Sequence, residues 1–534
     1  MTDRERLRRQ IGQLMVFGFE GLTVPDTMAD LIRSHYVGNI IFFSRNVANR
    51  EQVSGLTDVL QQLAREGGQE LPLTISADQE NGIVRRLPPD MPGLPGSMAL
   101  GATGRPDNAF RSGVVTARLL KQVGINFNLA PVLDINNNPT NPVIGVRSYG
   151  DQGDWVAAYG INFMSGLQSE GVIALAKHFP GHGDTDVDSH RGLPVIAHGR
   201  SRLDLVELVP FVGAIAAGVD AIMTAHVVFP AVDPTRVAAT LSRSVLTGLL
   251  RDELGFGGVL TTDCLEMDAI SETVGVGPGA VAALKAGADM IMVSHRLDRQ
   301  LQAIQAIEEA VLSGEIPESR IEEANARVGA LKAKRLAVVP LTPDWASLQV
   351  EAKTLQIELS GQALTPLKWS GGLPQSPLSI AVLSDETTPV MVAAGRQGPN
   401  PWVKDAVSQA CPAARVDLLN FPTALKAISS EDLLKKLAEY DLVVIGVNGD
   451  QNQPYLAFIN TLFGEDIPQV TLLLRSPYDA RLVGQAPNLL ALYENTPWMV
   501  DAAIQSLFQG PALGRLPLEV SISFPRGYRA KRAN

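Results

Sequence analysis

Cysteines, aromatic residues and long apolar runs are scarce in this sequence. The 534 residues include two cysteines, Cys264 and Cys411, which lie so far apart that we expect no structural disulfide. No run approaches the roughly 20 apolar residues of a membrane span, and no apolar stretch typical of a signal peptide follows the charged residues 1–6. We therefore expect a cytoplasmic protein without a membrane span.

Positive charge and histidine are also limited. Lys and Arg number 45 against 56 Asp and Glu, and the formal net charge of -11 argues against binding to nucleic acid or to an anionic membrane surface. All seven histidines lie before residue 300. Chemistry that depends on histidine must therefore belong to the first part of the chain.

Apolar, strand-like runs alternate regularly with helix-like segments over about 300 residues. The expected strands are 15–19, 37–43, 73–76, 127–130, 172–176, 221–224, 258–262 and 290–293. Polar residues such as Asp78, Asp134, His226 and Ser294 follow most of these strands, whereas an open doubly wound sheet would gather them at one switch point. The pattern predicts an α/β protein with a (β/α)8 TIM-type barrel.

A smaller α/β domain is expected after the barrel. We assign residues 1–338 to the barrel, 339–375 to a linker and connecting helix, and 376–534 to a C-terminal α/β sandwich domain. The expected C-terminal strands are 378–383, 441–446, 470–474 and 489–492.

The polar stretch 177–190 is the most informative part of the sequence. Its proline and glycines exclude a helix, so we expect a long loop at the carboxyl end of a strand. The catalytic residues of barrel enzymes lie at this end of the strands. Asp188 and His190 are two residues apart and can meet in an extended loop, where the carboxylate would orient the imidazole for acid–base catalysis. The alternative is a capping Asp beside a structural His.

Further carboxylates and arginines stand at the ends of other expected strands. Asp263 is placed either to attack an anomeric carbon as a nucleophile or to cap the following helix. Residues 78–86 and 145–150 carry charged groups suited to sugar hydroxyls, although their arginines could instead form structural ion pairs.

A metal site is the main rival interpretation of the loop. Residues of zinc-ligand type are His178, His182, Asp184 and His190. The sequence has no His-Glu-x-x-His motif and no second ligand cluster. We therefore expect neither a metal nor a cofactor.

These motifs resemble the β-N-acetylglucosaminidases of glycoside hydrolase family 3. The resemblance rests on the stretch 177–190 and on Asp263 in its Thr-Asp-x-Leu-x-Met context. It extends through Asp78-Gln79-Glu80, Gly145-x-Arg147-Ser148 and Thr224-Ala225-His226, and so covers the first domain. The family usually has Gly-Gly after Asp-x-Glu. This chain has Asn81-Gly82, and a side chain there would narrow the rim of the site.

The resemblance implies a retaining exo-glycosidase that removes terminal β-linked N-acetylglucosamine from peptidoglycan fragments. Asp263 would be the nucleophile, His190 the acid/base and Asp188 its dyad partner. The residues implied to hold the sugar are Asp78, Arg86, Arg147, Lys177 and His178. The expected partner is a small carbohydrate or muropeptide substrate.

Three alternatives stay open. A histidine acid/base does not repel an incoming anion, so phosphate could replace water and make the protein a phosphorylase. Family 3 β-glucosidases resemble this chain less, because they use a Glu, often from the second domain, and lack the Asp-x-His loop. A non-catalytic sugar-binding module would not need the intact acid, base and nucleophile. If the second domain approaches substrate, we expect residues 447–454 to do so, the alternative being a solvated turn.

Overall fold

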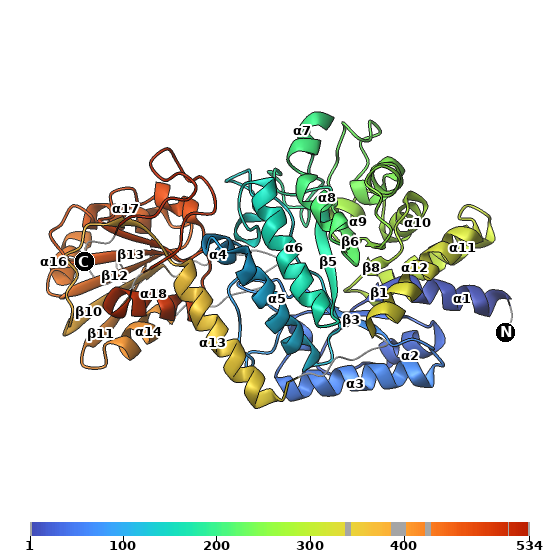
Figure 1. Ribbon diagram of the computed structural model, residues 1–534, viewed down its shortest axis with the longest axis horizontal. Coiled ribbons are helices and arrows are strands. Elements are labelled where there is room, and N and C mark those ends of the chain that lie inside the picture. The colour runs from blue at the N-terminus through green and yellow to red at the C-terminus, as the bar shows by residue number, and fades with distance from the viewer. Residues whose placement is uncertain (1–2, 337–342, 386–401, 422–428, 511, 532–534) are drawn as a thin grey trace.

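The first part of the chain folds into a parallel β-barrel. The computed structural model describes residues 3–336, 343–385, 402–421, 429–510 and 512–531 (Figure 1). Within these residues the first sheet has eight strands in the order β7-β6-β5-β4-β3-β2-β1-β8. A parallel bridge between Thr261 and Met290 joins its two ends. The predicted (β/α)8 barrel is therefore confirmed.

The barrel strands are short, and they are separated by helices. The strands are β1 Met15–Phe17, β2 Asn39–Phe42, β3 Thr74–Ala77, β4 Phe127–Asn128, β5 Ile173–Phe179, β6 Ala221–Thr224, β7 Val259–Thr261 and β8 Ile291–Val293. The helices are α1 Asp3–Leu14, α2 Asp26–Ser34, α3 Arg50–Glu66, α4 Ser97–Ala102, α5 Pro106–Lys121, α6 Gly153–Ser169, α7 Arg200–Leu205, α8 Val209–Ala216, the π-helix Ser244–Glu253, α9 Asp268–Ser271, α10 Val276–Ala286, α11 Leu297–Leu312 and α12 Glu318–Leu336.

Helix α3 illustrates how the sequence defines the outer helices. The side chain of Asn49 accepts a hydrogen bond from the Gln52 N–H and caps the first turn. Val53, Leu56 and Leu60 recur at helical spacing and are buried. This apolar stripe packs the helix against the barrel.

Strand β5 is longer than the sequence predicted. The expected strand ended at residue 176, but β5 continues through Lys177 and His178 to Phe179. Both polar side chains are buried, and each forms a salt bridge with a carboxylate. Because these carboxylates satisfy the two buried polar side chains, the strand can extend into residues whose sequence predicts a loop.

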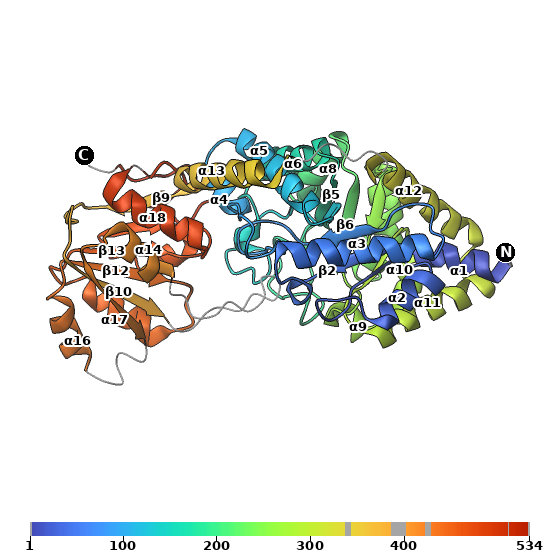
Figure 2. The same cartoon turned by 90° about the horizontal axis from the view of Figure 1, so that it is seen from below.

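The second sheet is mixed. Within the described residues it has six strands in the order β11-β10-β12-β13-β14-β9, parallel except for β9 at one edge. The strands are β9 Thr365–Trp369, β10 Ser379–Asp385, β11 Arg415–Phe421, β12 Leu442–Val447, β13 Gln469–Leu473 and β14 Asn488–Ala491. Helices α14 Trp402–Ala410 and α18 Pro497–Gln509 cover one face, and α16 Ser430–Leu437 and α17 Gln453–Leu462 the other (Figures 1 and 2).

Helix α13, Trp345–Ala363, joins the two sheets. It runs beside α5 before reaching the second sheet (Figure 1). Glu358 pairs with Arg111 at 2.6 Å, and Glu351 pairs with Arg118 at 2.7 Å. The apolar core of the second sheet also includes Met98 and several neighbours from the first part of the chain. The two parts therefore share packed surface.

The cysteines and the apolar character of the helices can be read directly from the structure. Cys264 and Cys411 both lie in the described residues and are free. None of the described helices combines the length and apolar character needed to cross a bilayer.

Candidate active site

A cavity of about 200 Å³ lies at the carboxyl ends of the barrel strands. Seven of the eight predicted site residues line it: Asp78, Arg86, Arg147, Lys177, His178, His190 and Asp263. The eighth, Asp188, contacts His190. The structure thus brings together all eight residues of the predicted catalytic and sugar-binding set.

A buried ion network is built around Glu80, which the predicted set did not include. Its carboxylate accepts hydrogen bonds from Arg147 Nε and Nη2, both at 2.8 Å, and lies 2.7 Å from Lys177 Nζ. Asp78 Oδ1 lies 2.6 Å from the same ammonium. Burial alone would raise the pKa of Glu80, but the two cations hold it well below its usual range. Burial would lower the pKa of Lys177, but its ion pairs with Asp78 and Glu80 outweigh burial and raise the pKa.

Asp134, another strand-end carboxylate, fixes the start of the loop. It accepts hydrogen bonds from His178 Nδ1 at 2.6 Å and from the His182 backbone N–H at 2.6 Å. Burial opposes ionisation, yet His178 and His182 together keep the pKa of Asp134 below its usual value. His178 is thereby oriented with its Nδ1–H toward Asp134. Asp134 follows β4, and this position is the signal that could have added it to the predicted set.

The rest of the loop is held by buried polar contacts. His182 Nδ1 lies 2.8 Å from Thr185 Oγ1, and its Nε2 lies 2.9 Å from Ser189 Oγ. Burial lowers the pKa of His182 to about 4, so this imidazole is neutral at pH 7. Gly183 packs so closely that a Cβ there would lie 1.7 Å from the Ile135 carbonyl oxygen. These contacts place the end of the loop at the cavity.

Asp188 and His190 form the predicted pair. His190 Nδ1 lies 2.7 Å from Asp188 Oδ1, which also accepts the His190 backbone N–H at 2.9 Å. Burial of Asp188 would raise its pKa, but these hydrogen bonds from His190 outweigh it and lower the pKa. With Nδ1–H donated to the carboxylate, His190 keeps Nε2 for other chemistry.

Asp263 stands at the end of β7. Its Oδ1 accepts the Cys264 N–H at 2.7 Å, and the next helix begins only at Asp268, so it does not cap that helix. Burial would raise the pKa of Asp263, but the surrounding imidazoles, those of His226 and His178 foremost, lower it overall. The group is therefore a carboxylate at neutral pH.

Asn81 does not narrow the rim as the sequence suggested. Its backbone is left-handed, with φ of 69°, and its amide faces inward. Nδ2 donates to Thr116 Oγ1 at 3.0 Å, and Oδ1 accepts from Gln79 Nε2 at 2.8 Å. The side chain does not line the cavity. The prediction was wrong because a positive φ turns this side chain away from the rim.

The loop residues that raised the possibility of a metal make hydrogen bonds instead. His178 Nδ1, both ring nitrogens of His182 and His190 Nδ1 contact oxygen atoms of the protein. Two groupings among the described residues have suitable spacing: Cys264, Glu266 and His295, and Asp184, His198 and Glu207. In the first, Arg45 Nη1 lies 3.0 Å from His295 Nδ1, and a guanidinium there disfavours a cation.

The C-terminal sheet stays outside this cavity. None of the described residues after His295 lines it. Residues 448–451, part of the predicted loop 447–454, instead line a separate pocket between the two parts of the chain.

Comparison with known proteins identifies the family. Residues 6–331 match the family model described as the glycosyl hydrolase family 3 N-terminal domain. This chain belongs to glycoside hydrolase family 3. The predicted family is confirmed, and with it the expectation of a glycoside hydrolase.

Two relatives are similar to the chain over more than the length of the barrel. It is 35% identical to "Beta-hexosaminidase A" of Pseudoalteromonas piscicida over 381 residues, which are 66% of this chain but only 63% of that protein. A solved family 3 β-N-acetylglucosaminidase from Paenibacillus sp. str. FPU-7 is 40% identical. The match covers 97% of this chain and 99% of that one, with a TM-score of 0.89. Both parts of the fold therefore recur together in this relative.

A third relative, also a solved structure, matches about the length of the barrel alone. It is a β-N-acetylhexosaminidase from Beutenbergia cavernae that is 28% identical, with a TM-score of 0.56. The match covers 98% of that chain but 61% of this one.

Proposed function

We propose that this family 3 member is a retaining exo-glycosidase that hydrolyses terminal β-linked N-acetylglucosamine. The observation that carries the proposal is the pairing of Asp263 with the Asp188–His190 dyad at one small cavity. A volume of about 200 Å³ suits one sugar ring, as exo action requires. The names of the relatives support N-acetylglucosamine as that sugar.

In the first step the Asp263 carboxylate attacks the anomeric carbon while the glycosidic C–O bond breaks. His190 Nε2 gives its proton to the departing oxygen. In the second step the same nitrogen takes a proton from water, whose oxygen displaces Asp263 and restores the β-configuration. The lowered pKa of Asp263 suits this role, since the attacking group must be ionised.

Asp188 supports both steps. Its negative charge stabilises the protonated imidazole that begins the reaction, and its hydrogen bond keeps the proton on Nδ1 afterwards. The exchangeable proton is then confined to Nε2, the nitrogen available to substrate.

The remaining predicted residues would hold the terminal sugar. The charges of Arg147 and Lys177 are balanced by Glu80 and Asp78, so their N–H groups can donate to hydroxyls without a large net charge at the site. Arg86 and His178 complete this set on the cavity wall.

We place the substrate among peptidoglycan fragments and the reaction in the cytoplasm. We further propose that the parts of the chain have the roles expected from the sequence. Residues 1–338 carry out catalysis, residues 339–375 connect the two domains, and residues 376–534 have a supporting role. The catalytic cavity is lined by no described residue after His295, which supports that division.

Product analysis with an aryl β-N-acetylglucosaminide tests the function. We expect free N-acetylglucosamine in the β-configuration, with or without phosphate, and covalent labelling of Asp263 by a 2-fluoro sugar. Formation of a sugar 1-phosphate would identify a phosphorylase. Cleavage restricted to glucosides would identify a β-glucosidase. Sugar binding without turnover would identify a non-catalytic module. Inversion, or a label elsewhere, would overturn the assignment of Asp263.

A further inference from the structure

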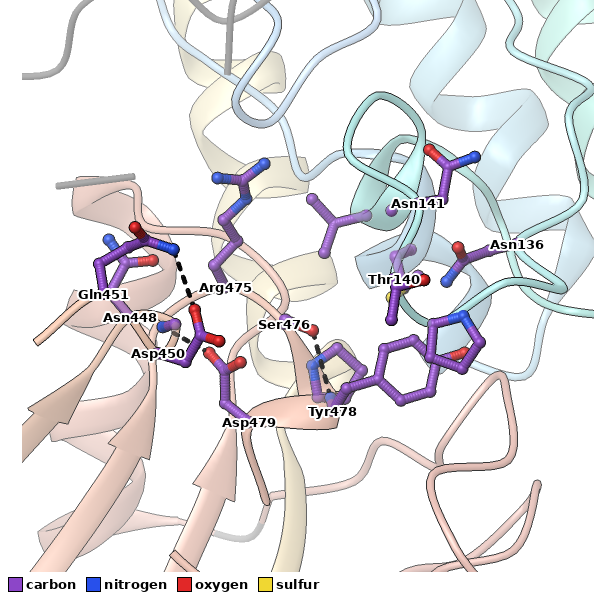
Figure 3. A pocket seen from close by; sticks show the side chains of 16 residues that line it. Asn136, Thr140, Asn141, Asn448, Asp450, Gln451, Arg475, Ser476, Tyr478 and Asp479 are labelled. Carbon is purple, nitrogen blue, oxygen red and sulfur yellow. Dashed lines mark hydrogen bonds between the residues drawn. The ribbon is translucent and has the colours of Figure 1, made fainter. Parts of the chain in front are cut away.

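A second cavity, which we call the interdomain pocket, lies between the barrel and the C-terminal sheet. Its volume is about 190 Å³. The barrel side contributes Asn136 and Thr140, and the C-terminal side contributes the segments after β12 and β13, residues 448–451 and 475–479 (Figure 3). Its lining is rich in amides and also carries charged groups, whereas charged groups and histidines supply most of the polar lining of the catalytic cavity.

Several polar atoms of the interdomain pocket have no partner in the described part of the chain. Asn136 is 1% exposed, yet neither Nδ2 nor Oδ1 of its side chain forms a hydrogen bond. Asn448 Oδ1, on the opposite wall, is also buried without a partner. A buried unpaired amide costs about 1–3 kcal/mol, so such groups usually face a ligand or ordered water.

The C-terminal wall adds charged and aromatic groups. No described residue accepts a hydrogen bond from the half-buried Arg475, whose side chain points along the pocket in Figure 3. Asp479 accepts the Gly449 N–H at 2.8 Å, and burial raises its pKa to about 6. Tyr478 adds an aromatic ring to the lining. Amides, hydrogen-bond donors and an aromatic ring together suit a sugar, which has polar edges and an apolar face.

One segment, residues 141–147, separates the two cavities. Asn141, Gly145 and Val146 line the interdomain pocket, while Val143 and Arg147 line the catalytic cavity. Asn141 Nδ2 also donates to the carbonyl oxygens of His182 and Gly183, both at 2.9 Å. A ligand in the pocket would therefore contact a segment that also supports the catalytic loop.

We propose that the interdomain pocket binds a second saccharide unit through its hydroxyl and acetamido groups. The inference rests on the proposed function, since the two cavities have nearly the same volume and the catalytic one is assigned to one sugar ring. Asn136 and Asn448 are the main recognition groups. The bound unit is either a distal sugar of the substrate or a separate free saccharide, and these sources share the same chemistry.

Kinetics with short and long substrates test the first source. Asn136→Ala and Asn448→Ala are compared with Gln409→Ala, an exposed amide on α14, as control. If a distal sugar binds, we expect KM for the β-1,4-linked N-acetylglucosamine trimer to rise about tenfold relative to KM for the aryl glycoside, a difference near 1.4 kcal/mol. Because the lost amide is unpaired, the melting temperature should not fall.

Equilibrium dialysis with N-acetylglucosamine tests the second source. Asp263→Asn protein should bind two molecules, and the same protein with Asn136→Ala and Asn448→Ala should bind one. If neither the trimer KM nor this stoichiometry changes, the pocket holds only water and the proposal fails. Failure of the proposed function looks different, because the unmutated protein would then not release free N-acetylglucosamine of β-configuration from the aryl glycoside.

Discussion

The catalytic cavity and the interdomain pocket are nearly equal in volume but differ in how their polar groups are satisfied. In the catalytic cavity Glu80 pairs with Arg147 and Lys177, and Asp134 pairs with His178. In the interdomain pocket the amide of Asn136 has no partner among the described residues. Paired groups are already oriented before substrate arrives, whereas unpaired ones gain their hydrogen bonds only from what binds.

This difference predicts that the catalytic cavity is rigid and that the interdomain pocket adapts to its ligand. The charged network of the first cavity links β3, β5 and the Gly145–Arg147 turn, so its geometry is set by folding. The second cavity is assembled from segments of both parts of the chain. We therefore expect substitutions in the first to reduce the rate of reaction and those in the second to change binding of larger ligands.

The largest expected effect comes from removing the nucleophile. Asp263→Asn keeps the shape of the side chain but cannot form the covalent intermediate, so kcat should fall by about 10⁴-fold or more. Circular dichroism and the melting temperature should stay near those of the unmutated protein. A residual kcat within tenfold of normal would show that another group attacks the sugar.

The next largest effect should follow from breaking the network at Glu80. Glu80→Gln leaves Arg147 and Lys177 buried with one carboxylate fewer, which costs about 3–5 kcal/mol of stability and about 10²-fold in kcat/KM. Glu66→Gln, at an exposed pair with Arg33, is the matched control and should cost less than about 1 kcal/mol. Equal losses in the two variants, measured by urea unfolding and kinetics, would contradict a positioning role for Glu80.

The barrel and its strand-end groups could be predicted because they follow from local patterns. Apolar runs separated by helical segments define the strands, and Asp263 and His178 are recognisable as polar residues at strand ends. The role of Glu80 could not be predicted in the same way. Its partners lie 67 and 97 positions away, and their contact depends on the side-by-side pairing of β3, β4 and β5.

The C-terminal sheet was predicted less completely for equally physical reasons. β9 contains Pro366 and pairs antiparallel at an edge, where proline is tolerated but the usual strand pattern is lost. β11 is half-buried along most of its length, so its sequence lacks a continuous apolar run. The interdomain pocket depends on how two distant segments meet, and no local pattern encodes that arrangement.

A smaller and substrate-dependent effect is expected at the dyad. Asp188→Asn removes the charge that stabilises protonated His190 and disturbs the hydrogen bond that fixes its Nδ1 proton. We expect about a 10²-fold loss in kcat/KM for substrates with poor leaving groups, which need protonation most. Activated aryl glycosides should lose less. Equal losses with both kinds of substrate would mean that Asp188 only shapes the loop.

The smallest effect concerns the contact between the two parts of the chain at Glu494, outside both cavities. Its carboxylate accepts hydrogen bonds from the Gly96 N–H at 2.7 Å, Thr496 Oγ1 at 2.9 Å and Trp498 Nε1 at 2.7 Å. Burial nevertheless raises the pKa of Glu494 to about 7. The folded state thus holds this proton more tightly than the unfolded state, where the pKa is near 4.5.

The sign of the resulting pH dependence follows from that difference. Stability from the protonated group is complete below about pH 4.5 and is lost as the pH rises to about 7, by at most about 1.4 kcal/mol per unit. Groups with a lowered pKa, such as Asp134, make the free energy of unfolding change with pH in the opposite direction. The contribution of Glu494 is therefore measured as the difference in unfolding free energy between a variant and the unmutated protein. Glu494→Gln should therefore gain stability relative to the unmutated protein between pH 5 and 7, measured by urea unfolding. The exposed Glu439→Gln control should show no such change, and a constant difference for Glu494→Gln across this range would mean that its carboxyl does not titrate there.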